Sequence, residues 1–150
     1  MPLRSHNKSL GFTIIELLIV LGIVSILGLF LTRDVSQLLA QGNFTNTVER
    51  MVRTLRTAQI YSLSGKNDSS WGVHYESGKL VLFKGTNYSS RDQSFDAPTD
   101  LPLSVDITGW SDIYFDKLRG IPSAPLSIAI ESQGRAGTIS VNSQGGIDRP

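Results

Sequence analysis

The segment that decides the architecture is residues 11–31, GFTIIELLIVLGIVSILGLFL. Of the positions from Phe12 to Leu31, 15 are Leu, Ile, Val or Phe. A helix of this length is about 30 Å long and matches the hydrocarbon core of a bilayer. The apolar side chains contribute about −4.5 to −9 kcal/mol to insertion, against about +3 kcal/mol for the single acidic residue, Glu16. Glu16 also lies near the start of the segment, where snorkelling lowers its cost. We therefore expect a membrane-spanning helix.

The charges that flank this segment predict its orientation. Arg4, His6 and Lys8 precede it, whereas Arg33 and Asp34 follow it with no net charge. Because positively charged residues stay on the cytoplasmic side, we expect the N-terminus in the cytoplasm and the C-terminal part outside. A secretory signal peptide is the alternative, but its apolar core is only about 7–15 residues long and ends at a small-residue cleavage site. No such site follows the segment.

Length and composition limit the remaining possibilities. With 150 residues, the chain is long enough for one modest domain and a membrane segment. It has no cysteines, which excludes disulfides, thiolate metal sites and cysteine nucleophiles. The formal net charge of +1 is too small for a strongly basic nucleic-acid-binding protein. The two histidines, His6 and His74, are far apart, His74 is expected on the surface of a strand, and no catalytic motif occurs. We therefore expect neither an enzyme nor a resident metal or other cofactor.

Residues 8–20, KSLGFTIIELLIV, closely resemble the prepilin leader junction of type IV pilins and type II secretion pseudopilins. In that family a membrane aspartyl peptidase cuts after the glycine and methylates the new N-terminal residue. The resemblance implies cleavage between Gly11 and Phe12, N-methylation of Phe12, and an assembly role for Glu16, whose carboxylate would pair with the Phe12 amine of a neighbour. It also implies the partners: the prepilin peptidase, other pilin-like subunits contacted through the N-terminal helix, an inner-membrane assembly platform and, before assembly, membrane lipid.

Beyond the membrane segment, apolar residues continue at the spacing of an amphipathic helix. The pattern comprises Phe44, Val48, Met51, Val52, Leu55, Ala58 and Ser62. Because no proline occurs between Phe12 and Leu63, we expect one helix over this range, about 75 Å long, with a hypothetical kink at residues 41–43. The expected organisation is a cleaved cytoplasmic leader (1–11), a transmembrane and filament-core helix (12–31), its amphipathic continuation (32–64) and a β-rich extracytoplasmic domain (65–150).

Three arginines, Arg50, Arg53 and Arg56, lie three residues apart on this expected helix and form a loose ridge. One interpretation is a contact with DNA, because some pilins take part in DNA uptake. The simpler interpretation, which the sequence favours, is a solvated face or ion pairs between subunits.

After residue 65 the pattern changes to short strands. Trp71–Glu76 and Lys79–Lys84 flank Ser77-Gly78 and predict a β-hairpin with a two-residue turn. Residues 85–102 are polar and are expected to form a long surface loop. Because no βαβ spacing occurs, the expected fold is α+β, a long helix packed on an antiparallel sheet domain. Further strands are expected at Leu103–Ile107, Ile113–Phe115, Leu126–Glu131, Thr138–Asn142 and Ile147–Asp148.

This order of a long helix, a hairpin, a polar loop and closing strands is similar to the minor-pilin and pseudopilin branch related to GspH and FimT. The resemblance implies a structural subunit, a minor pilin or a pseudopilin, in a type IV pilus or type II secretion-like filament at the cell surface or in the periplasm. The alternatives are a pilin-like tip subunit for DNA uptake or adhesion, and an uncut single-pass membrane protein with an outer β-domain. Asp112, Asp116 and Asp148 suggest a calcium site like those of some pseudopilins, but they lack the spacing of a calcium-binding loop, so no metal site is expected.

Overall fold

The computed structural model describes residues 11–132 and 134–150, with side chains at all of these positions except 29–41. Its one long helix, α1, covers Ile14–Leu63. Residues 41–43 are helical within α1, so the helix is not interrupted at the position of the hypothetical kink. The chain divides between Gln37 and Leu38 into two compact units, and each is described by itself.

The first unit exposes apolar side chains on every face of its helix. Phe12 is 83% exposed and Ile14 82%, and each Leu, Ile or Val from position 15 to position 27 is at least 51% exposed. The exposed residues Leu17–Leu21 are consecutive, and five consecutive positions cover more than one turn of a helix. By mean hydropathy, no helix is long and apolar enough to cross a membrane within the residues that could be searched. The membrane-spanning helix expected at 12–31 therefore remains a prediction.

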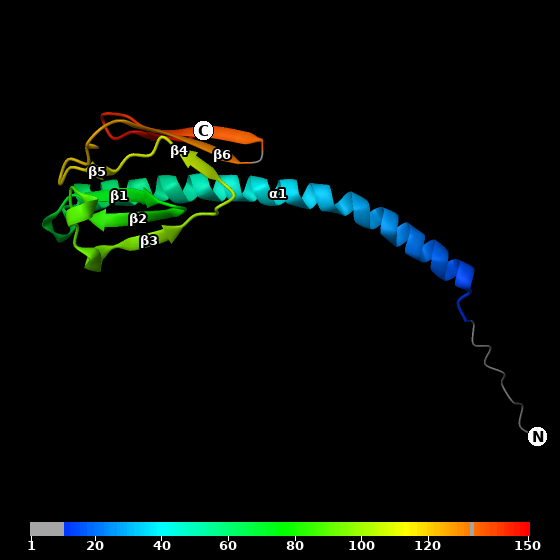
Figure 1. Cartoon of the computed structure of the whole chain (residues 1–150). Helices are drawn as coiled ribbons and strands as arrows, with labels where there is room; N and C mark the ends of the chain where they lie inside the picture. The colour runs from blue at the N-terminus through cyan, green and yellow to red at the C-terminus, as the bar shows by residue number, and fades with distance from the viewer. Residues whose placement is uncertain (1–10, 133) are drawn as a thin grey trace, which may run out of the picture. The chain divides into compact units, whose positions relative to one another are not determined.

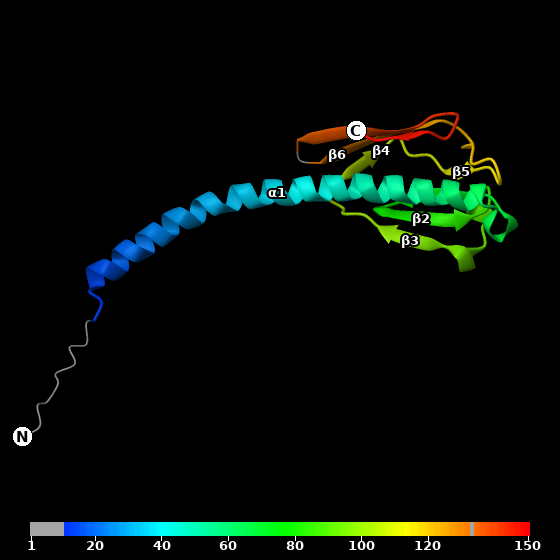
Figure 2. The same ribbon diagram turned by 180° about the vertical axis from the view of Figure 1, so that it is seen from behind.

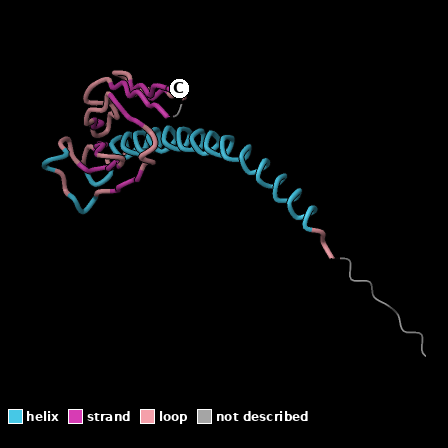
Figure 3. The backbone as a smooth tube through the Cα atoms, turned by 45° about the vertical axis from the view of Figure 1, so that its right-hand side comes forward, coloured by secondary structure: helices cyan, strands magenta, loops and turns pink. Residues whose placement is uncertain are grey.

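In the second unit, the C-terminal half of α1 packs against two antiparallel sheets (Figure 1). The first sheet has the order β3-β2-β1-β5, with β1 (Trp71–Glu76), β2 (Lys79–Lys84), β3 (Ala97–Asp100) and β5 (Ile113–Phe115). The second has the order β4-β6-β7-β8, with β4 (Asp106–Thr108), β6 (Leu126–Ser132), β7 (Arg135–Val141) and β8 (Ile147–Asp148). Short 3₁₀ turns occur at Lys66–Asp68, Tyr88–Ser90 and Gln93–Phe95. Figures 2 and 3 show the strands of both sheets gathered along this stretch of helix.

The predicted hairpin is confirmed, and its turn has a clear local cause. β1 and β2 pair in antiparallel register from Trp71 opposite Lys84 to Glu76 opposite Lys79. Ser77 and Gly78 both have positive φ, 41° and 80°. This is the backbone conformation of a type I′ turn, whose twist matches that of the strands it joins.

A single hydrophobic core joins the helix to both sheets. Every residue of the predicted amphipathic pattern, from Phe44 to Ser62, is buried. These helix residues meet side chains from the first sheet, such as Val73 and Phe115, and from the second, such as Ile128 and Ile139. The prediction of an α+β fold with a helix packed on antiparallel sheets is therefore confirmed.

Three details of the strand prediction are wrong. β3 lies inside the region expected to be a loop, and it is an edge strand, which is where a strand tolerates a proline such as Pro98. β4 begins at Asp106 rather than at Leu103, whose side chain is 85% exposed. β7 begins three residues early, at Arg135, because its pairing with β6 extends as far as Ser132 opposite Arg135.

Candidate assembly site and polar surfaces

The predicted processing site lies in exposed chain just before the helix. Residues 11–13 have no regular structure, and α1 begins at Ile14. A Cβ built on Gly11 would meet no other atom within 4 Å, and the Phe12 ring is exposed. Both residues that flank the predicted cleavage site are therefore exposed, and the cleavage remains a prediction.

Glu16 lies in the first turn of α1 and is exposed. Its backbone N–H donates to Thr13 Oγ1 at 3.3 Å, and the N–H of Leu17 donates to the Thr13 carbonyl at 3.2 Å. Thr13 is therefore the N-cap residue, and Thr13 and Glu16 have the spacing of a capping box. The cap was not predicted, although its Thr-x-x-Glu signal is visible in the sequence. The first turn also favours a carboxylate electrostatically, so Glu16 suits its position even before any partner is present.

The three arginines expected to form a ridge are all exposed, but they do not form one site. Arg50 Nη1 donates to the backbone carbonyl of Asp100, at the end of β3, at 2.9 Å. Arg50 and Arg53 line the same groove beside Thr99, whereas Arg56 is not part of its lining. The structure therefore brings Arg50 and Arg53 together and leaves Arg56 apart.

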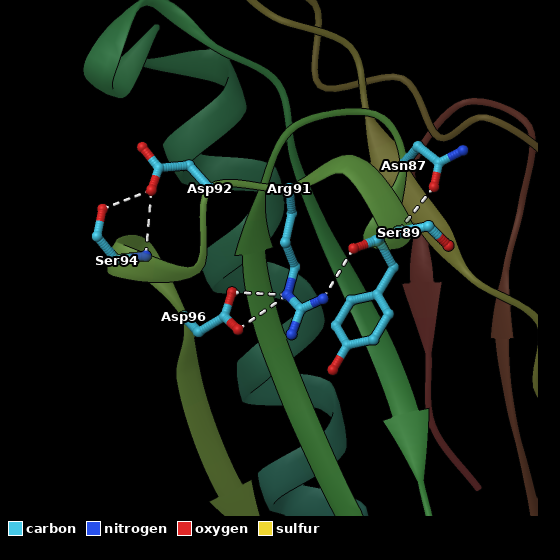
Figure 4. Close-up of polar contacts among 7 residues, drawn as sticks. Asn87, Ser89, Arg91, Asp92, Ser94 and Asp96 are labelled. Atoms are coloured by element: carbon cyan, nitrogen blue, oxygen red, sulfur yellow. Dashed lines mark hydrogen bonds and ion pairs between the residues drawn. The ribbon is translucent and has the colours of Figure 1, made fainter.

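Residues 85–96, expected to be an open loop, are folded against the first sheet (Figure 4). Arg91 Nε donates to both carboxylate oxygens of Asp96, at 3.0 and 2.8 Å, and Nη1 donates to the Tyr88 carbonyl at 2.8 Å. The guanidinium lies 3.6 Å from the centre of the Tyr88 ring, and the His74 ring stacks on Tyr88 at 3.6 Å and 11°. Since two groups so close cannot share one face of a ring, Tyr88 lies between Arg91 and His74.

Two local turns complete this segment. Asn87 Oδ1 accepts a hydrogen bond from the N–H of Ser89 at 2.8 Å. Asp92 Oδ1 accepts from the N–H and the hydroxyl of Ser94, at 3.1 and 2.6 Å (Figure 4). These side-chain-to-backbone bonds are typical of Asn and Asp in turns. The segment is therefore pre-ordered, and it buries Phe83 on the sheet face opposite the helix, where Phe83 is 1% exposed.

His74 lies on that same outer face, as expected, but it is covered rather than open. Its Nδ1 is 2.6 Å from Asp112 Oδ1, and its side chain is 20% exposed. Of the aspartates considered for calcium, Asp112 therefore contacts His74, while Asp148 lies in β8 of the other sheet. Among the side chains that the structure describes, at residues 11–28, 42–132 and 134–150, no group of three acidic, histidine or cysteine residues is placed to hold a metal.

Two exposed carboxylates have a lowered pKa. A hydrogen bond from the Lys117 ammonium, together with its charge, lowers the pKa of Asp68. Hydrogen bonds from the hydroxyl and N–H of Ser94 lower the pKa of Asp92. Since both groups are at the surface and both shifts favour the ionised form, these carboxylates stabilise local structure.

Comparison with known proteins places the two units in context. Residues 6–32 match the prokaryotic N-terminal methylation motif. The fold is similar to that of the minor pseudopilin EpsH from the Type 2 Secretion System of Vibrio cholerae, with a TM-score of 0.53 and 10% sequence identity, over 72% of this chain and 96% of that chain. No curated protein matches the sequence. The chain thus combines a prokaryotic N-terminal methylation motif with a fold similar to that of a minor pseudopilin, in agreement with the resemblance seen in the sequence.

Proposed function

We propose that this chain is a structural subunit, of the minor class, in a type IV pilus or a type II secretion-like filament. The observation that carries the proposal is the methylation motif at residues 6–32, which leads into a helix with apolar side chains exposed on every face. The similarity of the fold to a minor pseudopilin supports the choice of class.

In this proposal the chain is first processed at its N-terminus. A prepilin peptidase cuts between Gly11 and Phe12 and methylates the new amine of Phe12. The exposure of both residues ahead of α1 supports this step. Glycine suits the position because a residue without Cβ lets the backbone fit closely into a protease.

Before assembly, the apolar helix lies in the cytoplasmic membrane with its N-terminus inside and the β-rich unit outside. Exposed apolar side chains in such number need a cover of lipid or protein, because each large one gains about 1.5–3 kcal/mol when it leaves water. At an inner-membrane assembly platform, the helices of neighbouring subunits replace the lipid. The finished filament then stands in the periplasm or at the cell surface.

Glu16 sets the axial register of neighbouring subunits when their helices replace the lipid. It is the one acidic residue between Phe12 and Leu31, and cleavage creates a free amine on Phe12. An unpaired carboxylate in apolar surroundings costs several kcal/mol, so the filament is most stable where Glu16 of one subunit meets the Phe12 amine of the next.

Co-expression with a prepilin peptidase and a filament assembly machinery tests the proposal. Intact-mass measurement should show loss of residues 1–11 and one added methyl group, located at Phe12 by fragmentation. A chain that stays uncut, or that is cut elsewhere, contradicts the proposed processing.

The role of Glu16 is tested in the same system. Glu16→Ala should be cut and inserted like the wild type but recovered in filaments at about one-tenth of its level or less, since the pair contributes more than about 1.4 kcal/mol. Glu16→Asp keeps the charge and should recover part of the level. Equal recovery of Glu16→Ala and the wild type would remove the proposed role.

A further inference from the structure

A groove of about 350 Å³ runs between α1 and the edge strand β3 in the second unit. Its two walls therefore come from segments far apart in the sequence. The lining residues are Asn46, Glu49, Arg50, Arg53, Thr54 and Thr99. All of them are polar or charged, so the groove suits a polar group.

The groove carries a net positive charge. Glu49 is neutralised, because Arg149 Nη1 lies 2.7 Å from its carboxylate. Arg50 donates to a backbone carbonyl, and no described carboxylate lies within ion-pair distance of it. Arg53 has no carboxylate within ion-pair distance among the residues that the structure describes. Since like charges three residues apart on a helix repel each other, an anion bound between Arg50 and Arg53 would relieve that repulsion.

The wall that presents these charges is held in place. Thr54 Oγ1 donates to the carbonyl of Arg50 at 2.9 Å, and Arg50 Nη1 fastens the helix to the Asp100 carbonyl at 2.9 Å. The bond to Asp100 uses one N–H group of Arg50, so other donors of its guanidinium remain for a ligand. Because less freedom is lost on binding, a pre-positioned guanidinium binds more tightly than a mobile one.

We propose that this groove binds an aspartate or glutamate side chain of an adjacent filament subunit. The inference rests on the proposed function, because it requires a neighbouring subunit. A guanidinium presents parallel N–H donors that match the two oxygens of a carboxylate, and Arg50 and Arg53 offer two such groups side by side.

The charges around the groove favour a single carboxylate over a nucleic acid. Among the described residues that line the groove, Arg50 and Arg53 are the two cations. A duplex needs several cations along its path, whereas Arg56 lies outside the groove.

Zero-length cross-linking of filaments assembled from the full chain tests the contact directly. In Arg53→Lys, a carbodiimide can join the new amine to a touching carboxylate as an amide, and peptide mass spectrometry then locates the bond. We expect a cross-link from position 53 to an Asp or Glu of another pilin-like subunit. The matched control, Arg56→Lys, should give none. A bond only within the chain, no bond at position 53, or equal bonds from both variants would overturn the proposal.

Incorporation measurements separate this proposal from the proposed function. Arg53→Gln should enter filaments at about one-tenth of the wild-type level, since a charge-assisted hydrogen bond lost at an interface has about a tenfold effect or more, and Arg56→Gln should enter like the wild type. If the wild type enters and Arg53→Gln enters equally, only the groove proposal fails. If the wild type never enters a filament, the proposed function fails as well. If Arg53→Gln instead weakens binding to duplex DNA while filament entry is unchanged, the groove is a nucleic-acid site and the proposal is wrong.

Discussion

Replacing Gly72 by alanine tests how tightly the outer face of the first sheet is packed. A Cβ at Gly72 would lie 2.5 Å from Phe83 Cζ and 2.7 Å from the Ile113 carbonyl oxygen. Ordinary carbon contacts are about 3.5–4.0 Å, so the neighbours must move by about 1 Å. The Phe83 ring is buried and the oxygen belongs to the paired strand β5, so neither can simply turn away. Overpacking of this kind costs about 1–3 kcal/mol, and the lower entropy of the unfolded alanine chain offsets about 0.4–1 kcal/mol.

We therefore expect Gly72→Ala to lower the free energy of unfolding by about 1–2 kcal/mol. Urea titration of the full chain in detergent can measure it, because both tryptophans, Trp71 and Trp110, lie in the second unit and report its unfolding. With an m-value of about 1–3 kcal/mol/M, the midpoint should fall by about 1 M.

A matched control, Gly42→Ala, is expected to change the free energy of unfolding in the opposite direction. A Cβ at Gly42, within α1, would meet no atom within 4 Å, so Gly42→Ala should raise stability by up to about 1 kcal/mol through helix propensity. Adding Phe83→Leu to Gly72→Ala should recover part of the lost stability by making room. A midpoint for Gly72→Ala equal to or above that of the wild type would refute the packing argument.

Three further perturbations test individual contacts. Ser62→Ala should cost about 1–3 kcal/mol in urea unfolding, because the buried N–H of Trp71 loses its acceptor at 2.9 Å; Ser62→Thr, which keeps the hydroxyl, should cost less. Because folding lowers the pKa of Asp68, the ionised carboxylate stabilises the folded state above the ordinary pKa of 3.8, and this stabilisation is lost as the pH falls below 3.8. In Asp68→Asn, the free energy of unfolding should therefore depend less steeply on pH below about pH 4. Arg91→Ala leaves the 19%-exposed Asp96 carboxylate without its partner, and limited proteolysis should then cut residues 85–96 faster, whereas Arg53→Ala should leave the rate unchanged.

Most of the fold could be predicted because its causes are local. The two-residue turn defines the hairpin, and the spacing of apolar residues defines the buried face of α1. β3 was missed because an edge strand needs neither alternation nor freedom from proline. The order within residues 85–96 was missed because it depends on Tyr88 stacking on His74 at the outer face of the first sheet, a contact between residues that are distant in sequence.

The two candidate sites also differ in how far the sequence alone predicts them. The processing and assembly residues stand next to each other in sequence, so a motif reveals them without any fold. The groove beside Arg53 forms only when Thr99 of β3 reaches the helix, and helical spacing alone suggested a ridge of three arginines. The Thr13 cap was accessible from the Thr-x-x-Glu spacing and needed no tertiary information.

The shared core has a consequence for how the second unit opens. Both sheets bury their inner faces against the same stretch of α1, so releasing either one uncovers the helix side chains that the other also contacts. A state in which one sheet is released thus loses much of the core, although the conformational entropy of the helix is still lost. We expect amide hydrogens in β1 and β7 to exchange with the same opening free energy, as one cooperative unit, although the two strands belong to different sheets.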